Sequence, residues 1–353
     1  MNVIDLCERG LIPDRLTRLG MRKLMAKRLN DEGANDSELA SLHRQQILDH
    51  LRSSPIAIET EAANEQHYEV PAQFFHRHLG PRLKYSCCLY PTGNETLAQA
   101  EELMLSLYAE RAGLVDGMRI LDLGCGWGSL SLWLAEHYPN SQIVGLSNSH
   151  GQREFIEGQA AKRGFSNLTI VTGNIVEVEF PVAHPHSGEP VLADFDRIIS
   201  IEMFEHMRNY GLLLAKLSRW LKTEGQLFVH IFAHRHLTYF FEDKADDDWM
   251  TRYFFTGGIM PSDSLLAYFQ DDFALTRQWW VDGRHYEKTS NHWLEGMDNS
   301  KEAVMPLLVA TYGEAQAAIW FQRWRMFYMA VAELFGYDQG REWGVGHYLF
   351  QKR

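Results

Sequence analysis

The chain has 353 residues, of which 45% are hydrophobic, and its formal net charge is −12. This apolar content is typical of a globular protein with a substantial core, and the length predicts a core fold with sizeable additions. The negative charge argues against a nucleic-acid partner, because phosphates attract basic protein surfaces. No apolar run approaches the ~20 residues that a membrane-spanning helix needs.

The cysteines and the first residues indicate the compartment. The segment MNVIDLCERG lacks the basic and then apolar plan of a secretory signal. The four cysteines, Cys7, Cys87, Cys88 and Cys125, show no metal-ligand spacing. We therefore expect a cytoplasmic protein with free thiols and no bound metal.

Residues 1–60 predict two or three helices, and residues 15–28 form a basic amphipathic segment. We interpret this segment as a solvated helix with Leu16, Leu19 and Leu24 turned inward. The alternative is a helix that contacts a membrane surface or a partner. The N-terminal helices could also support a homodimer. The basic residues are Arg15, Arg18, Arg22, Lys23, Lys27 and Arg28.

Further along the chain, short apolar runs alternate with amphipathic segments. This βα rhythm predicts a doubly wound, mostly parallel α/β sheet. Residues 181–193 contain three prolines and a glycine, which predicts a surface insertion. The expected strands are 119–123, 142–146, 168–172, 196–202 and 225–232, and the expected helices are 97–112, 152–163 and 212–221.

The last third is rich in aromatic residues. Residues 235–275 predict a loop-rich cap over a ligand cleft, residues 300–336 predict helices, and residues 347–351 predict a closing strand. In the cap, Tyr253 and Phe254 are expected to contact the substrate, because ring faces attract cations. The acidic residues 246–248 are expected to cap a helix. We divide the chain into a helical extension (1–98), a nucleotide-binding core (99–234) and the cap with closing elements (235–353).

The sequence ILDLGCGWG at 120–128 is the most informative motif. An apolar strand ends in a glycine-rich turn that precedes a helix, which predicts a cradle for a nucleoside cofactor at the strand's carboxyl end. Glycine is needed where backbone closely approaches a ligand. The spacing G-x-G-x-G differs from the G-x-G-x-x-G of dinucleotide folds, and no Lys-Ser/Thr pair follows as in a P-loop.

Polar residues follow the next two expected strands. Asn148 and Gln152 come after the second strand, where side chains commonly bind ribose hydroxyls. Asn174 follows the third strand and could bind the adenine amino group. We therefore expect these residues to complete the cofactor site.

The fourth strand runs into Glu202, Glu205 and His206. This cluster lies at a strand's carboxyl end, so it predicts a substrate site that can bind an ammonium group and accept its proton. Nearby carboxylates should raise the imidazole pKa, whereas burial should lower it. The alternative is a structural network in which Glu205 bonds to backbone N–H groups.

Together these segments resemble the cyclopropane fatty-acid synthase superfamily of S-adenosylmethionine (SAM) methyltransferases, and most closely its coclaurine N-methyltransferase-like group. The resemblance implies a class I, Rossmann-like SAM-methyltransferase fold with a helical N-terminal extension and an inserted cap. It also implies SAM as cofactor and S-adenosylhomocysteine (SAH) as product. The landmarks are HYEVPAQFF, YSCCLY, LDLGCGWGSLSLWLA, IEMFEHMRNY, YFFTGGIMPS and EWGVGHYLF.

The resemblance assigns roles position by position. Glu202, Glu205 and His206 match the substrate cluster of the N-methyltransferases, and Glu69 matches an acid that helps to hold the amine. In the mechanism this implies, Glu202 and Glu69 bind the ammonium, Glu205 orients His206, and His206 takes the proton. The cofactor positions are Tyr85 and Ser86 at the amino-acid end, Gly124 and Gly126 at the turn, Asn148 and Gln152 at the ribose, and Asn174 and Ile175 at the adenine.

A departure from the family separates two activities. The lipid-cyclopropanating branch uses a bicarbonate held by a cysteine, a glutamate, a histidine and a tyrosine, of which Cys87, Glu205 and His230 match the first three. That branch has a small residue where this chain has Glu202, and its tyrosine has no direct match here, although Tyr328 lies close in sequence. A second carboxylate suits a protonated amine. We therefore favour N-methylation of a small amine over lipid modification or a non-catalytic SAM-binding protein.

Overall fold

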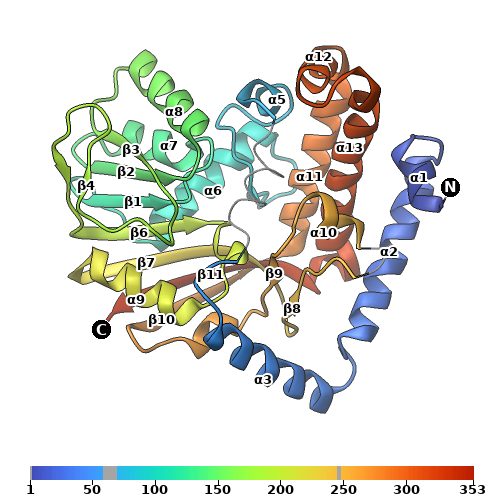
Figure 1. Cartoon of the computed structure of the whole chain (residues 1–353), viewed down its shortest axis with the longest axis horizontal. Helices are drawn as coiled ribbons and strands as arrows, with labels where there is room; N and C mark the ends of the chain where they lie inside the picture. The colour runs from blue at the N-terminus through green and yellow to red at the C-terminus, as the bar shows by residue number, and fades with distance from the viewer. Residues whose placement is uncertain (1, 59–69, 245–247) are drawn as a thin grey trace.

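A seven-stranded sheet forms the centre of the computed structural model, which describes residues 2–58, 70–244 and 248–353. The strand order is β10-β11-β7-β6-β1-β2-β3 (Figure 1). The bounds are β1 Arg119–Leu123, β2 Gln142–Ser147, β3 Leu168–Thr172, β6 Phe195–Ile201, β7 Leu221–His234, β10 Phe273–Val281 and β11 Trp343–Lys352.

The direction of the strands positions the site. Strands β7, β6, β1, β2 and β3 run parallel to one another, whereas β11 is antiparallel to both β7 and β10. From β1 the chain builds outward to β2 and β3, and it returns to build β6 and β7 on the other side of β1. Ligands bind at such a reversal, outside the carboxyl ends of the strands. The predicted doubly wound sheet is confirmed, and the reversal lies between β1 and β6.

The helices of the core begin at side-chain caps. Thr96 caps α6 (Leu97–Arg111) in a capping box with Gln99, Ser149 caps α8 (His150–Arg163), and Asn209 caps α9 (Tyr210–Trp220). Each cap satisfies a backbone N–H that has no partner inside the helix. α7 (Ser129–His137) instead follows Gly128, whose φ is 81°. The predicted surface insertion is a small hairpin of β4 (Val182–Ala183) and β5 (Pro190–Val191).

Two elements of the last third were not predicted: β10 and α11 (Gly283–Asn299). β10 is an edge strand whose central residues are exposed and whose register shifts between Leu275 and Arg277, so its apolar alternation is broken. α11 begins with glycine, and only a few large side chains form its apolar face, so its sequence does not show a clear helical pattern. The predicted helices after it are α12 (Lys301–Tyr312) and α13 (Glu314–Gly336). The cap contains β8 (Tyr239–Phe240), α10 (Trp249–Tyr253), β9 (Ile259–Met260) and η2 (Leu265–Tyr268).

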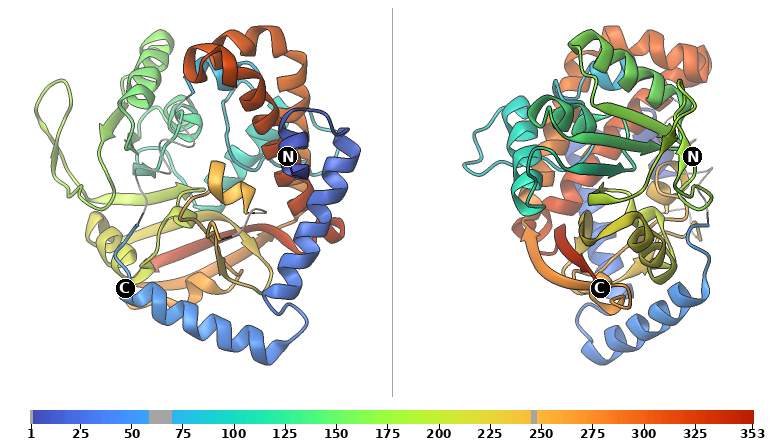
Figure 2. Two further views of the ribbon diagram at one scale, coloured as in Figure 1. Left: turned by 45° about the vertical axis from the view of Figure 1, so that its right-hand side comes forward. Right: turned by 90° about the vertical axis from the view of Figure 1, so that its left-hand side faces the viewer.

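Three N-terminal helices confirm the prediction for residues 1–60: α1 (Val3–Glu8), α2 (Asp14–Asp31) and α3 (Ser37–Ser53). α2 packs along α13, and α3 runs below the sheet (Figures 1 and 2). Within the parts of the chain that the structure describes, no helix is long and apolar enough to cross a membrane.

The orientation predicted for α2 is wrong. Leu16, Leu19 and Leu24 are 57%, 45% and 43% exposed, so they face outward. Met25 is buried in the core instead, and Met21 and Leu29 pack against the same core. Arg18 and Arg22 both pair with Glu333 of α13, so a different apolar face and these ion pairs orient the helix.

Two glycines give a prediction about packing. A Cβ on Gly283 would lie 2.2 Å from the Trp343 carbonyl oxygen and 2.3 Å from that of Phe335. G283A would therefore push the start of α11 away from the backbone at these two residues. We expect G283A to destabilise the fold by at least ~1–3 kcal/mol. A Cβ on exposed Gly158, inside α8, has no atom within 4 Å, so G158A should stabilise by about 0.5–1 kcal/mol. Urea unfolding of both variants tests this, and equal midpoints would contradict it.

Candidate active site

Two cavities meet at the reversal point of the sheet. The first, here called the glycine-loop cavity, lies against residues 122–130 and the loop at 83–86. The second, the aromatic cavity, lies under the cap and has about 790 Å³ of empty space. Tyr85 and Glu202 line both cavities, so a ligand in one lies next to a ligand in the other.

The glycine turn after β1 has the conformation that its sequence predicts. Gly124 and Gly126 have φ values of 81° and 51°, which side-chain-bearing residues rarely adopt. A Cβ on Gly124 would lie 2.9 Å from the Met203 side chain, whereas one on Gly126 meets no atom within 4 Å. Asp122 at the end of β1 is buried and accepts a hydrogen bond from Ser131 at 2.6 Å, and burial raises its pKa to about 7.

Two buried polar atoms near this turn lack partners. The Ser147 hydroxyl donates to Gln152 Oε1 at 2.6 Å, which fixes the amide. Gln152 Nε2 is buried and has no hydrogen-bond partner among the described residues, and the same holds for the Ser129 hydroxyl, which lines the glycine-loop cavity. Buried polar groups are normally satisfied, so these two atoms fit a polar ligand such as a nucleoside.

The remaining predicted cofactor residues lie beyond the strands β2 and β3. Asn148 is exposed after β2, and Ile175 is buried after β3. The Asn174 side chain accepts a hydrogen bond from the backbone N–H of Val176 at 2.9 Å. These positions are at the carboxyl edge of the sheet, as expected, but they are not among the residues that line the glycine-loop cavity.

Lys84 is a residue of this site that the sequence analysis missed. It is 1% exposed, and its ammonium donates to Ser86 Oγ at 2.5 Å and to the Cys87 carbonyl at 2.7 Å. The ammonium also lies 5.0 Å from the centre of the Tyr108 ring. Lys84 lines the glycine-loop cavity and brings a buried positive charge to it. The signal was its position directly before the Tyr85–Ser86 pair.

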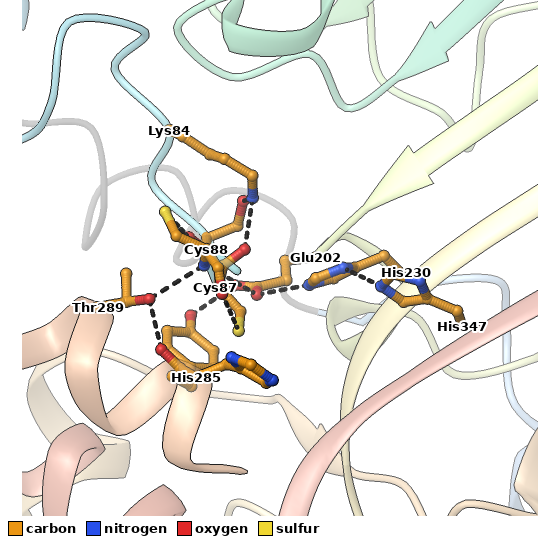
Figure 3. A network of polar contacts seen from close by, with 10 residues as sticks. Lys84, Cys87, Cys88, Glu202, His230, His285, Thr289 and His347 are labelled. Atoms are coloured by element: carbon orange, nitrogen blue, oxygen red, sulfur yellow. Dashed lines mark hydrogen bonds and ion pairs between the residues drawn. The ribbon is translucent and has the colours of Figure 1, made fainter. Parts of the chain in front are cut away.

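Glu202 is the meeting point of three hydrogen-bond donors (Figure 3). Its Oε1 accepts from the backbone N–H of Cys87 and from His230 Nε2, both at 3.0 Å. Its Oε2 accepts from the Tyr286 hydroxyl at 2.6 Å. The residue has φ 48°, a left-handed conformation that costs about 1 kcal/mol or more outside glycine. Such strain is typical of functional positions.

Glu205 and His206 lie on the short 3-10 helix η1 (Phe204–His206), directly after Glu202, and all three line the aromatic cavity. The structure therefore brings the predicted cluster together. Glu205 is 2% exposed, and its Oε2 has no hydrogen-bond partner among the described residues, so this oxygen is open to a ligand. The His206 ring stacks on Phe255, with ring centres 6.0 Å apart.

The three groups differ in how they hold protons. Burial, and then the Glu202 charge, raise the pKa of Glu205 well above its ordinary value. Burial also raises the pKa of Glu202, but the Lys84 charge and the hydrogen bonds from Tyr286 and Cys87 oppose this. Burial lowers the pKa of His206 to about 4. Burial therefore favours the protonated form of Glu205 and the neutral form of His206.

The wall of the aromatic cavity differs in part from the prediction. Phe255 lines it, but Tyr253 and Phe254 are not among its lining residues. The Tyr253 hydroxyl accepts from Arg323 at 2.9 Å, and Phe254 stacks on Phe327 at 4.4 Å, so both side chains pack against α13. The other aromatic lining residues are Tyr85, Phe232, Phe241, Tyr286, Trp293, Phe327 and Phe335.

Several further expectations concern the edges of the site. Glu69, and the first two acids of 246–248, lie outside the described residues. Asp248 precedes α10 but makes no side-chain cap; it accepts from Arg28 and from the Lys244 N–H instead. Tyr328 bonds to His78 at 2.7 Å. The tyrosine that reaches Glu202 is Tyr286, which was missed because its helix, α11, was not predicted.

Comparison with known proteins gives one family. A family model described as mycolic acid cyclopropane synthetase matches residues 57–337. An (S)-coclaurine N-methyltransferase of Thalictrum flavum subsp. glaucum is 37% identical over 352 residues, covering 98% of this chain and 94% of that protein. A crystal structure of coclaurine N-methyltransferase bound to N-methylheliamine and SAH superposes with a TM-score of 0.93 at 36% identity, covering 99% of both chains. The cyclopropane-fatty-acyl-phospholipid synthase of Escherichia coli K12 is 29% identical over 65% of this chain and 55% of that protein.

Proposed function

Because the chain belongs to the mycolic acid cyclopropane synthetase family and is a SAM-dependent methyltransferase, we propose that it methylates the nitrogen of a small amine with an aromatic or apolar body. The predicted family, cofactor and class I methyltransferase fold are confirmed. The relatives that match over nearly the whole chain carry names of alkaloid N-methyltransferases. The substrate class is the proposal.

The glycine-loop cavity fits the cofactor. We assign Tyr85, Ser86, Gly124 and Gly126 to its wall, together with Lys84, whose buried charge a bound carboxylate would compensate. The unpartnered Gln152 amide and Ser129 hydroxyl are suited to polar groups of a nucleoside. When bound, SAM supplies a methyl group that its sulfonium already activates.

The residues of the aromatic cavity would bind the protonated amine and remove its proton. An amine arrives mostly protonated near pH 7, so its nitrogen must lose a proton before it can attack. Glu202 would bind the ammonium, and Glu205 Oε2 would accept the proton, with His206 beside it. This assignment differs from the sequence-based hypothesis, in which His206 is the base, because the pKa of His206 is about 4 while that of Glu205 is raised.

One observation favours an amine over a lipid: the hydrogen bonds to the Glu202 carboxylate. In the cyclopropanating branch, a cysteine and a histidine at these positions hold a bicarbonate. Here the Cys87 N–H and His230 Nε2 already donate to the protein's own carboxylate, and Tyr286 donates to its other oxygen. A bicarbonate could bind there only by displacing Glu202. A fixed buried carboxylate stabilises a cation, as ammonium binding requires.

A direct assay tests this function. We expect SAH release with secondary and tertiary aromatic amines, and none with unsaturated phospholipid vesicles, whether or not bicarbonate is added. Product mass would show one added methyl group, and the NMR spectrum of the product would place it on nitrogen. Methyl incorporation into acyl chains that depends on bicarbonate would overturn the amine assignment in favour of lipid modification.

A further inference from the structure

A chain of hydrogen bonds leads from Glu202 across the neighbouring strands β7 and β11 to Arg111, and Figure 3 shows its members Glu202, His230 and His347. His230 Nε2 contacts Glu202 at 3.0 Å, and His230 Nδ1 contacts His347 Nε2 at 2.8 Å. His347 Nδ1 then contacts Arg111 Nη1 at 2.6 Å. The two histidines are directly opposed on the antiparallel strands β7 and β11, which places their rings on the same face of the sheet.

The direction of these hydrogen bonds is fixed at the Arg111 end. The Arg111 guanidinium has only N–H donors, so His347 Nδ1 must accept. A neutral His347 then carries its proton on Nε2 and donates to His230 Nδ1. His230 in turn carries its proton on Nε2 and donates to Glu202 Oε1. Every hydrogen bond therefore points from the guanidinium toward the carboxylate.

The surroundings keep both imidazoles neutral. His230 and His347 are fully buried, and the ring of Tyr108 lies 5.2 Å and 5.5 Å from theirs. Burial, and then the nearby cationic or basic groups, lower the pKa of each histidine well below its ordinary value. Among the described residues, the other ionisable groups near Glu202 come from four elements. They are Lys84, Tyr85, Cys87 and Cys88 on the loop after α5 (Ala72–His76), Glu205 and His206 on η1, Tyr108 on α6 and Tyr286 on α11.

This polarity has a consequence for proton movement. For a proton to leave Glu202 along the chain, every hydrogen bond would have to reverse, and Arg111 would have to accept a proton. A guanidinium does not lose its own proton in proteins, so that route is closed. The chain of hydrogen bonds can therefore polarise the Glu202 carboxylate, but it cannot carry a proton away from it.

We propose that Arg111 and His347 are positioning residues that hold Glu202 as an ionised acceptor for the substrate's ammonium, and that the substrate's proton leaves on the Glu205 side of the cavity. The ammonium N–H bond breaks there, the electron pair stays on nitrogen, and the proton binds Glu205 Oε2 or His206. The proposal rests on the proposed amine N-methylation. In it, Glu202 binds the ammonium and Glu205 lies on the side where the proton leaves.

Substitutions of His347 test the positioning role through the pH profile. H347F removes the donor to His230, so the pKa of Glu202 should rise and the acid limb of kcat/KM should move upward by about one pH unit. H347Q restores a donor and should return the limb to its wild-type position. H78F is the matched control, since His78 is equally buried but bonds to Tyr328 instead. An unmoved limb in H347F would overturn the proposal.

A second measurement does not depend on any substrate. In ¹⁵N-labelled wild-type enzyme, the imidazole signals of His230 and His347 should show the neutral Nε2–H form of both rings between pH 6 and 9. R111M removes the N–H that donates to His347 Nδ1, so it should change the His347 signal. A protonated His347, or an Nδ1–H form, would refute the polarity even if the amine assay succeeds. The neutral Nε2–H pattern without any amine turnover would instead leave the polarity intact and refute the proposed function.

Discussion

Replacement of Glu205 by glutamine is expected to lower turnover of the amine substrate by about 10²–10⁴-fold, the usual contribution of a general base. Glutamine has the same shape, but its amide cannot accept a proton. The Oε2 atom concerned is buried, has no partner among the described residues, and belongs to a group that lines the aromatic cavity. Steady-state kinetics of E205Q with saturating SAM would measure the loss.

A measurement of unfolding stability distinguishes a loss of turnover in E205Q from a loss of folded protein. The pKa of Glu205 is raised above its ordinary 4.5 in the folded protein, so the native state binds this proton more tightly than the unfolded state. Wild-type stability from this group therefore falls as the pH rises above about 4.5. E205Q lacks this penalty and should be at least as stable as wild type at pH 7–8. Wild-type turnover of E205Q, with E302Q as an exposed control, would refute the role of Glu205 as base.

Replacement of Glu202 by glutamine should act on substrate binding. The amide oxygen can still accept from Cys87 and His230, and the Tyr286 hydroxyl can turn to accept from the amide nitrogen, so the fold should be kept. The negative charge is lost, however. Removing one partner of a buried charge pair costs about 2–5 kcal/mol, which predicts that kcat/KM falls by roughly 30-fold to several thousand-fold.

The division between KM and kcat identifies the role. If Glu202 binds the ammonium, E202Q raises KM for the protonated amine, and SAH binding measured by calorimetry stays near the wild-type value. Y286F is the matched comparison, because it removes one donor and leaves the charge in place, so its effect should be smaller. An unchanged KM in E202Q would show that the carboxylate does not hold the amine.

Local sequence patterns predicted much of the core. β1 and β3 have the bounds that their apolar runs indicate, and α6 begins at Leu97, as its helical spacing predicts. β10 and α11 were missed, since an exposed edge strand with a register shift carries no clean alternation. The inward face of α2 was assigned wrongly, because Met21, Met25 and Leu29, and not Leu16, Leu19 and Leu24, pack on the core.

The glycine turn and the clustering of Glu202, Glu205 and His206 could be predicted from local sequence, because residues a few positions apart are neighbours in any compact chain. What each of these groups can do depends on residues that folding brings to them from elsewhere. Tyr286 and His347 reach the site from distant elements, and burial separates the pKa of Glu205 from that of His206. Hydrogen-bond polarity and desolvation depend on which groups surround a side chain, and those surroundings come from segments far apart in the sequence.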